Sequence, residues 1–444
     1  MSVSNGKSPP VAFVNARLLD PASRLDAPGG LLVLDGRIAD VGPRLFNEGP
    51  PELARTIDCA GHCLAPGLVD MRVQLREPGE EHKETFATGG LAAAVGGVTS
   101  MVALPNTDPV VDDVASVEYV ARRARDVKLA KVYTYAAVTR RLEGKEITEI
   151  GLLAEFGARG FTDGLQAVAN AQVMRRALSY ARAFDQVIVQ HPEEPSLAGG
   201  VMNEGEVATR LGLEGVPAAA EVIMVERDLR LVELTGGRYH AAHLTTAGAV
   251  AAIREAKARG LPVTCDTAPH YCLLTEQDVG DYRTFAKVSP PLRGEADRQA
   301  VAEAVADGTI DAIASDHSPH DQESKRLPFA VADPGMAGLE TLLPLSLKLA
   351  RNNNVQLLDI LERLTAAPAS ILGLEAGRLA PGLPADLVLF DPDRAWRIDP
   401  DRFHSKSKNS LFDDVEVRGQ VQATVVDGRT IYEAEARPAE LEAV

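Results

Sequence analysis

The middle of the chain alternates short apolar runs with longer amphipathic stretches. The runs lie at residues 67–73, 99–106, 131–138, 157–163, 186–191, 238–244, 262–270 and 310–317. Their length and the turn-forming residues that bound them are typical of buried strands. Amphipathic helices are indicated between them at residues 113–127, 171–184, 218–236 and 245–260. Eight strands with crossover helices predict an α/β fold, a (β/α)8 barrel over residues 67–374. A doubly wound open sheet is the alternative from pattern alone, but no GxGxxG or Walker loop follows a strand.

The two ends of the chain have a different pattern. Short β-rich runs separated by Gly, Asp and Pro occupy residues 11–20 and 30–42, and again residues 385–394 and 417–433. An Asp-Gly-Arg turn, a hairpin signal, lies in each end. We therefore expect one small β-sandwich module that combines residues 1–66 with residues 375–444.

Composition narrows the choice of partners and compartment. The chain has 444 residues, a formal net charge of −17 and a pI of about 5.1, so nucleic acid and anionic membranes are not expected partners. No apolar leader or membrane-spanning run is evident. The four cysteines show no disulfide framework, which favours a reducing, cytoplasmic location.

Polar residues gather at the predicted carboxyl ends of the barrel strands, where barrel enzymes carry their active sites. Six of the nine histidines are among them. A single histidine could be an ordinary core or loop residue, but six at the strand ends favour a functional site. Arg72 and Gln74 end the first strand and share one face of it, since they lie at i and i+2. The others are Asn106, Asp163, His191, His240, His243, His270, Asp316, His317 and His320.

Long motifs built on these residues resemble the dihydroorotases of the amidohydrolase superfamily, in the long, barrel-plus-sandwich form. The matching segments include APGLVDMRVQLREPG, VALPNTDP, HAAHLTTAGAV, TAPHYCLLTE and IDAIASDHSPH, and the resemblance covers residues 10–435. It implies interconversion of dihydroorotate and N-carbamoyl aspartate, with a zinc-bound water as nucleophile and a carboxylate moving the proton.

The resemblance also implies roles for particular residues. Asp316 matches a zinc ligand that is also the catalytic base, and Asp163, His191 and His243 match the remaining ligand positions. A set of three ligands with room for water would suffice for a residual zinc site. No lysine lies between residues 145 and 257, which excludes a carboxylated lysine on strand 4 and weakens the likeness to hydantoinases.

The substrate-binding positions are largely kept. Arg76, Asn106 and His320 match residues that hold the substrate carboxylate, for which a bidentate arginine is well suited. Ser289, however, stands where the family usually has Asn.

The main departure is on the first strand, where the family's His-x-His aligns with Arg72-Val73-Gln74. Gln is a poor zinc ligand, and a protonated guanidinium is none. A unit charge about 4 Å away contributes roughly 4 kcal/mol, and a divalent ion feels about twice that. We expect the zinc site on this strand to be absent, with Arg72 paired to Asp316 so that the buried carboxylate keeps a partner.

The favoured interpretation is a catalytically defective dihydroorotase homologue. The resemblance implies that such chains serve as structural partners of aspartate carbamoyltransferase in pyrimidine biosynthesis, in a hetero-oligomer. A homodimer is the alternative assembly. The second interpretation is an active zinc dihydroorotase with a reduced metal site. The third is allantoinase or another cyclic-amide hydrolase, although the Arg-Glu-Pro-Gly and Pro-Asn-Thr segments favour dihydroorotate.

Overall fold

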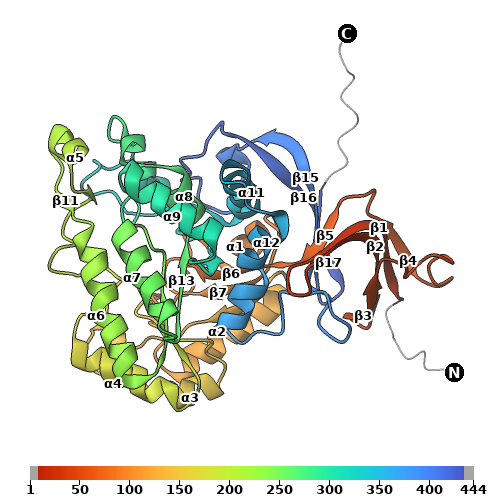
Figure 1. The fold of residues 1–444 in the computed structure, drawn as a ribbon, viewed down its shortest axis with the longest axis horizontal. Coiled ribbons are helices and arrows are strands. Elements are labelled where there is room, and N and C mark those ends of the chain that lie inside the picture. The colour runs from red at the N-terminus through yellow and green to blue at the C-terminus, as the bar shows by residue number, and fades with distance from the viewer. Residues whose placement is uncertain (1–8, 435–444) are drawn as a thin grey trace, which may run out of the picture.

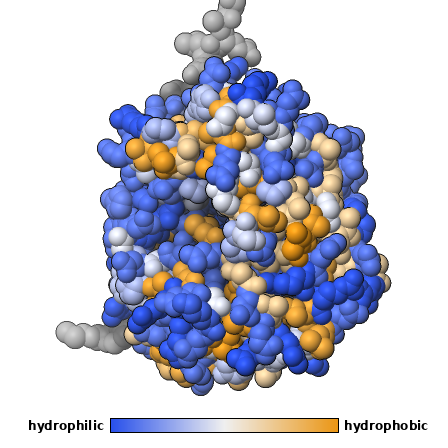
Figure 2. Space-filling view, turned by 90° about the vertical axis from the view of Figure 1, so that its left-hand side faces the viewer, coloured by the Kyte–Doolittle hydropathy of each residue, from blue (hydrophilic) through white to orange (hydrophobic). Residues whose placement is uncertain are grey.

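The computed structural model describes residues 9–434, which form a barrel joined to a β-rich module (Figure 1). Residues 1–8, on which most of the leader prediction rests, and residues 435–444 of the predicted sandwich lie outside this range. In residues 9–434, no helix is both long and apolar enough to cross a membrane. Seen from the left of Figure 1, the surface is mostly hydrophilic, with separate hydrophobic areas and a hollow near the middle (Figure 2).

The barrel predicted from the apolar runs is confirmed. Its strands are parallel, and their residues are β6 (Leu68–Val73), β7 (Val98–Ala103), β8 (Lys131–Thr134), β9 (Val187–Gln190), β12 (Arg238–Ala241), β13 (Val263–Thr267) and β14 (Ala312–Ile313). Phe161 supplies the fourth position through bridges to Ala136 and Ile188, and a bridge from Val73 to His317 closes the ring. The expected strand at 157–163 shrinks to the single residue Phe161, because Gly157 and Gly160 both take positive φ.

Helices cover the outside of the barrel. The longer ones are α1 (Phe86–Val95), α2 (Val114–Val127), α4 (Ala171–Arg182), α6 (Ala219–Thr235), α7 (Ala247–Ala258), α9 (Glu295–Asp307), α11 (Leu342–Asn352) and α12 (Leu357–Leu364). The shorter ones are α3 (Ile150–Glu155), α5 (Glu206–Leu211), α8 (Pro269–Leu273), α10 (Gln322–Lys325) and α13 (Ala366–Ile371). Polar caps set several starts: Asp113, Asn170 and Thr246 each accept a backbone N–H of the first turn of α2, α4 and α7.

The β-rich module is one eight-stranded sheet made from both ends of the chain. From the N-terminal end come β1 (Val11–Asp20), β2 (Leu25–Leu34), β3 (Arg37–Gly42), β4 (Arg55–Asp58) and β5 (Cys63–Pro66), and from the C-terminal end β15 (Leu387–Arg397), β16 (Glu416–Val426) and β17 (Arg429–Glu433). The junction is an antiparallel pairing of β5 with β15, which extends from Cys63 opposite Phe390 to Pro66 opposite Leu387. Because β6 follows β5 directly, this sheet fixes where the barrel begins.

Two further features bear on the site. A small parallel pair, β10 (Met202–Asn203) with β11 (Gly215–Val216), lies in the long segment after β9. The four cysteines, Cys59, Cys63, Cys265 and Cys272, are free, as the sequence predicts, and the structure also shows that they are buried. Burial raises the pKa of Cys59 to about 12, so this thiol stays protonated at neutral pH.

Candidate active site

The predicted site residues lie at or just beyond the carboxyl ends of the barrel strands. Arg72 is in β6, His191 follows β9, His243 follows β12, and Asp316 follows β14. All four are buried. The backbone at His243 and Asp316 takes positive φ, 37° and 51°, which costs free energy for residues other than glycine. The turn after each strand therefore holds its side chain in a strained conformation that aims it inward.

Arg72 forms the centre of the site. Its side chain is among the largest fully buried ones, with 1% of the residue exposed, and its Nε donates to Asp316 Oδ1 at 2.9 Å. Nη2 donates to the Gly164 carbonyl at 3.3 Å. The predicted pairing of Arg72 with Asp316 is thus confirmed. Burial alone would raise the pKa of Asp316, but its interactions with His243 and with the Arg72 guanidinium outweigh burial and hold this pKa well below its usual range.

Two histidines continue the network away from Asp316. His243 Nδ1 lies 3.1 Å from Asp316 Oδ2, and His243 Nε2 lies 2.8 Å from His191 Nδ1. His191 Nε2 in turn lies 3.0 Å from Glu193 Oε2. Two of the four ring nitrogens face carboxylates, and the other two face each other. A ring nitrogen that faces a carboxylate donates to it, and of the two ring nitrogens that face each other one donates to the other.

His243 is the uncharged histidine of this network, and the Glu193 carboxyl is held as an anion. Burial, and then the charge of Arg72, lower the pKa of His243 to about 4, so His243 is the neutral ring. The hydrogen bond from His191 offsets the burial of Glu193 and lowers the pKa of its carboxyl. Arg72 is the permanent cation of the network, and it is bonded to the Asp316 carboxylate. This pairing avoids the large cost of an unpaired buried ion.

The ligand positions fit a zinc ion poorly. Asp163 accepts from the backbone N–H of Thr139 at 2.9 Å and from the Thr139 hydroxyl, and burial raises the pKa of Asp163 to about 6. The expected set of Asp163, His191 and His243 is therefore not assembled, because Thr139 holds Asp163 and the two histidines hold each other. Within residues 9–434, no three His, Cys, Asp or Glu side chains form a group that could hold a metal ion.

Gln74 fills the other lost ligand position. Its Nε2 donates to Ser318 Oγ at 2.6 Å, and its Oε1 accepts from Asn106 Nδ2 at 3.2 Å. Asn106 is thus engaged by Gln74. Arg76 and His320 do meet, with Arg76 Nη2 3.1 Å from His320 Nε2. Of the three predicted substrate-binding residues, the structure brings Arg76 and His320 into contact and bonds Asn106 to Gln74, just beyond β6.

Very little space remains between these groups. Gln74, His270, Ser289, Asp316 and Met336 are among the residues that line a cavity of ≈ 20 Å³. That volume holds about one water molecule, whereas pockets for small-molecule ligands typically measure about 300–1,000 Å³. In this conformation the site has no room for a cyclic amide substrate.

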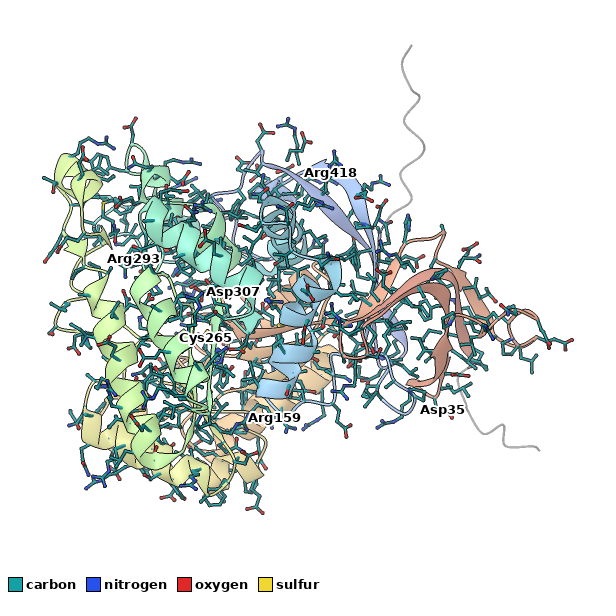
Figure 3. The ribbon with its side chains drawn as sticks, in the orientation of Figure 1. Asp35, Arg159, Cys265, Arg293, Asp307 and Arg418 are labelled. Carbon is teal, nitrogen blue, oxygen red and sulfur yellow. The ribbon has the colours of Figure 1, made fainter. Side chains whose placement is uncertain are left out.

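Sequence reasoning missed Glu193 and Thr139. Glu193 lies two residues beyond His191, in a segment whose acids could have been noticed, and Ser289 Oγ donates to it at 3.1 Å. Nothing in the sequence singles out Thr139. Arg293, labelled inside the barrel half of Figure 3, also approaches Glu193, with Nη2 3.9 Å from Oε1.

A parallel barrel with its polar site at the strand ends, joined to a β-rich module made from both chain ends, is the architecture of an amidohydrolase. Solved structures agree: L-hydantoinase (dihydropyrimidinase) from Arthrobacter aurescens matches with a TM-score of 0.87 and 26% identity, covering 98% of each chain. Dihydropyrimidinase from Brevibacillus agri, at 22% identity and a TM-score of 0.82 over 95% of this chain and 94% of that one, supports the fold alone.

Sequence comparisons are more specific. A model of dihydro-orotase-like proteins matches residues 61–249, and an amidohydrolase family model matches residues 287–432. The dihydroorotase of Anaplasma phagocytophilum is 46% identical over 429 residues, which is 96% of each chain. That of Syntrophotalea carbinolica is 45% identical over 423 residues, 95% of this chain and 99% of its own. This chain belongs to the dihydroorotase family.

Proposed function

We propose that this chain is a non-catalytic dihydroorotase homologue that acts in pyrimidine biosynthesis as a structural partner of aspartate carbamoyltransferase. The observation that carries the first half is the buried guanidinium of Arg72, bonded to Asp316 at 2.9 Å. In the family this carboxylate would bind zinc and move the proton. Here it is committed to a permanent cation and to His243, which is 3.1 Å away.

Three further features support the loss of catalysis. A fixed unit charge about 4 Å from a divalent ion costs on the order of 8 kcal/mol at an effective dielectric constant near 20. His191 and His243 are hydrogen-bonded to each other at 2.8 Å. The cavity of ≈ 20 Å³ excludes substrate. Without a zinc-activated water, Asp316 has no nucleophile to deprotonate, and its low pKa makes it a weak base.

An active dihydroorotase is the second candidate. Relatives named dihydroorotase are 43–46% identical to nearly the whole chain, and Arg76 keeps the orientation toward His320 that a carboxylate clamp requires. In that case Arg76 and His320 would hold the substrate carboxylate, and any zinc would fall to Asp163, His191 and His243 after these residues exchange their present partners.

One sample decides between the two candidates. Purified protein is assayed for dihydroorotate hydrolysis and for the reverse condensation of N-carbamoyl aspartate, and its zinc content is measured on the same preparation. We expect no turnover above the uncatalysed rate. A turnover in the ordinary enzyme range of about 1–10³ s⁻¹, together with bound zinc, would establish the second candidate.

The partner is tested separately. The chain and aspartate carbamoyltransferase from the same organism are co-expressed, and co-purification and transferase activity are measured. We expect a stable hetero-oligomer and a loss of transferase activity when this chain is withheld. A fully active transferase that does not bind this chain would contradict the structural role, whatever the catalytic assay shows.

A further inference from the structure

Strand β8 is buried less than its neighbours in the barrel. Lys131, Val132 and Tyr133 are only half-buried, whereas every residue of β6, β7 and β9 is buried. The cause is the helix that follows. α3 has six residues, against fourteen in α2 and twelve in α4, and at 1.5 Å per residue it spans only about 9 Å. The normal layer of helices is incomplete here.

This gap is a groove of ≈ 600 Å³, which we call the α2–α3 groove. Its floor is apolar and includes Val117, Ala121 and Ala124 of α2 and Val132 of β8. Phe156, just beyond α3, is 42% exposed and lines both this groove and an adjoining one of ≈ 590 Å³. An exposed aromatic ridge between two hollows is the kind of feature that protein interfaces cover.

The rim of the α2–α3 groove is positively charged. Arg125, Lys128, Arg159 and Arg429 line it, and in residues 9–434 none of the four has a carboxylate within 4.0 Å. Arg159 lies over the Tyr133 ring at 5.5 Å, at the lower edge of the barrel in Figure 3. Lys131 is neutralised, because Asp386 and Asp427 lie 2.8 and 2.7 Å from its Nζ. Four cations without a carboxylate partner in the described part of the chain, gathered around one apolar floor, stand out in a protein of net charge −17.

These features define the occupant. We propose that the α2–α3 groove binds an acidic amphipathic segment of the partner protein, with apolar side chains on Phe156 and the floor and carboxylates on the rim cations. This proposal rests on the proposed partner role. A second copy of the chain fits less well, because a symmetric contact would place the same cations opposite each other. Nucleic acid would leave the apolar floor unsatisfied and face the net negative charge of the chain.

The test compares affinities of full-length variants for aspartate carbamoyltransferase by titration calorimetry at low and moderate salt. Phe156→Ala removes the ridge, and Arg125→Glu with Arg159→Glu reverses part of the rim. Arg210→Glu is the matched control, since Arg210 is exposed on α5, away from the groove. We expect each groove change to weaken binding about tenfold or more, the control to bind normally, and salt to weaken the wild type.

The outcomes separate the two proposals. A wild-type complex that tolerates all groove changes overturns the groove while the partner role stands. Failure of the wild type to bind overturns both. Thermal unfolding of each variant guards against misfolding, because these side chains are exposed and their substitution should leave the unfolding midpoint nearly unchanged.

Discussion

Arg72 and Arg76 lie four residues apart, but their guanidinium groups have different kinds of partner. Arg72 is 1% exposed and bonded to a carboxylate inside a buried network. Arg76 is 7% exposed, and it donates to the Pro319 carbonyl at 3.2 Å and to Glu80, whose side chain is 35% exposed. The first guanidinium takes the place of metal ligands and supports the barrel interior, whereas the second has partners that water or a ligand could replace. A family site can thus lose the residues of its reactive centre and keep the residues at its substrate-binding edge.

The strongest test of the contrast between Arg72 and Arg76 is to restore the family's zinc-binding histidines on the first strand. Arg72→His with Gln74→His removes the fixed cation and frees Asp316. We expect zinc binding to rise from well below one ion per chain to about one, measured by metal analysis after dialysis. Each single variant is the control and should bind little zinc. If the double variant also binds little, repulsion by Arg72 is not what excludes the metal.

Removing the Arg72 charge alone should cost the most stability. Arg72→Met leaves Asp316 buried without its ion-pair partner, and we expect the free energy of unfolding to fall by about 3–5 kcal/mol in urea denaturation. Adding Asp316→Asn should recover more than half of the loss, because no carboxylate is then stranded. Arg230→Met is a matched control, since Arg230 on α6 has a side chain 75% exposed. An equal loss in both single variants would contradict the role of Arg72.

The free energy of unfolding should depend on pH through His320, at the substrate-binding edge of the site. Burial, and then the charge of Arg76, lower the pKa of His320 to about 3. A histidine with a lowered pKa stabilises the fold fully above its unfolded pKa of about 6.5, and this contribution is lost as pH falls toward 3. Between pH 7 and pH 5 the loss from His320 should reach about 2 kcal/mol.

The control for this titration is His320→Gln, which keeps a polar side chain that does not ionise in this range. Its free energy of unfolding should fall less than that of the wild type between pH 7 and pH 5. Parallel pH profiles for the two proteins would show that His320 is not the group responsible.

Arg76 should matter less for folding than Arg72. Arg76→Met removes hydrogen bonds to the Pro319 carbonyl and to the partly exposed Glu80, so we expect a loss of about 1–2 kcal/mol, measured by the same denaturation. A loss as large as that of Arg72→Met would remove the distinction between the two arginines.

Much of this arrangement could be predicted from the sequence. Parallel strands bring their carboxyl ends to one edge, so a charged residue after each apolar run had to meet the others, and Arg72 was bound to find Asp316. The other contacts of the site could not be predicted. Thr139 takes Asp163, and Glu193 takes His191, because loop conformations and rotamers decide these contacts. The closure of the cavity depends in the same way on the loop that carries Met336.

Because both chain ends contribute to the sheet, the sheet can be completed only late in synthesis. β5 ends at Pro66, but its partner β15 begins only at Leu387. At about 5–20 residues per second, the ribosome needs roughly 15–60 s to make the intervening segment. During that interval the N-terminal strands present an unpaired edge, which is open to contact with other chains. The nascent protein therefore depends on shielding, by chaperones or by its own growing barrel, until the last strands close the sheet.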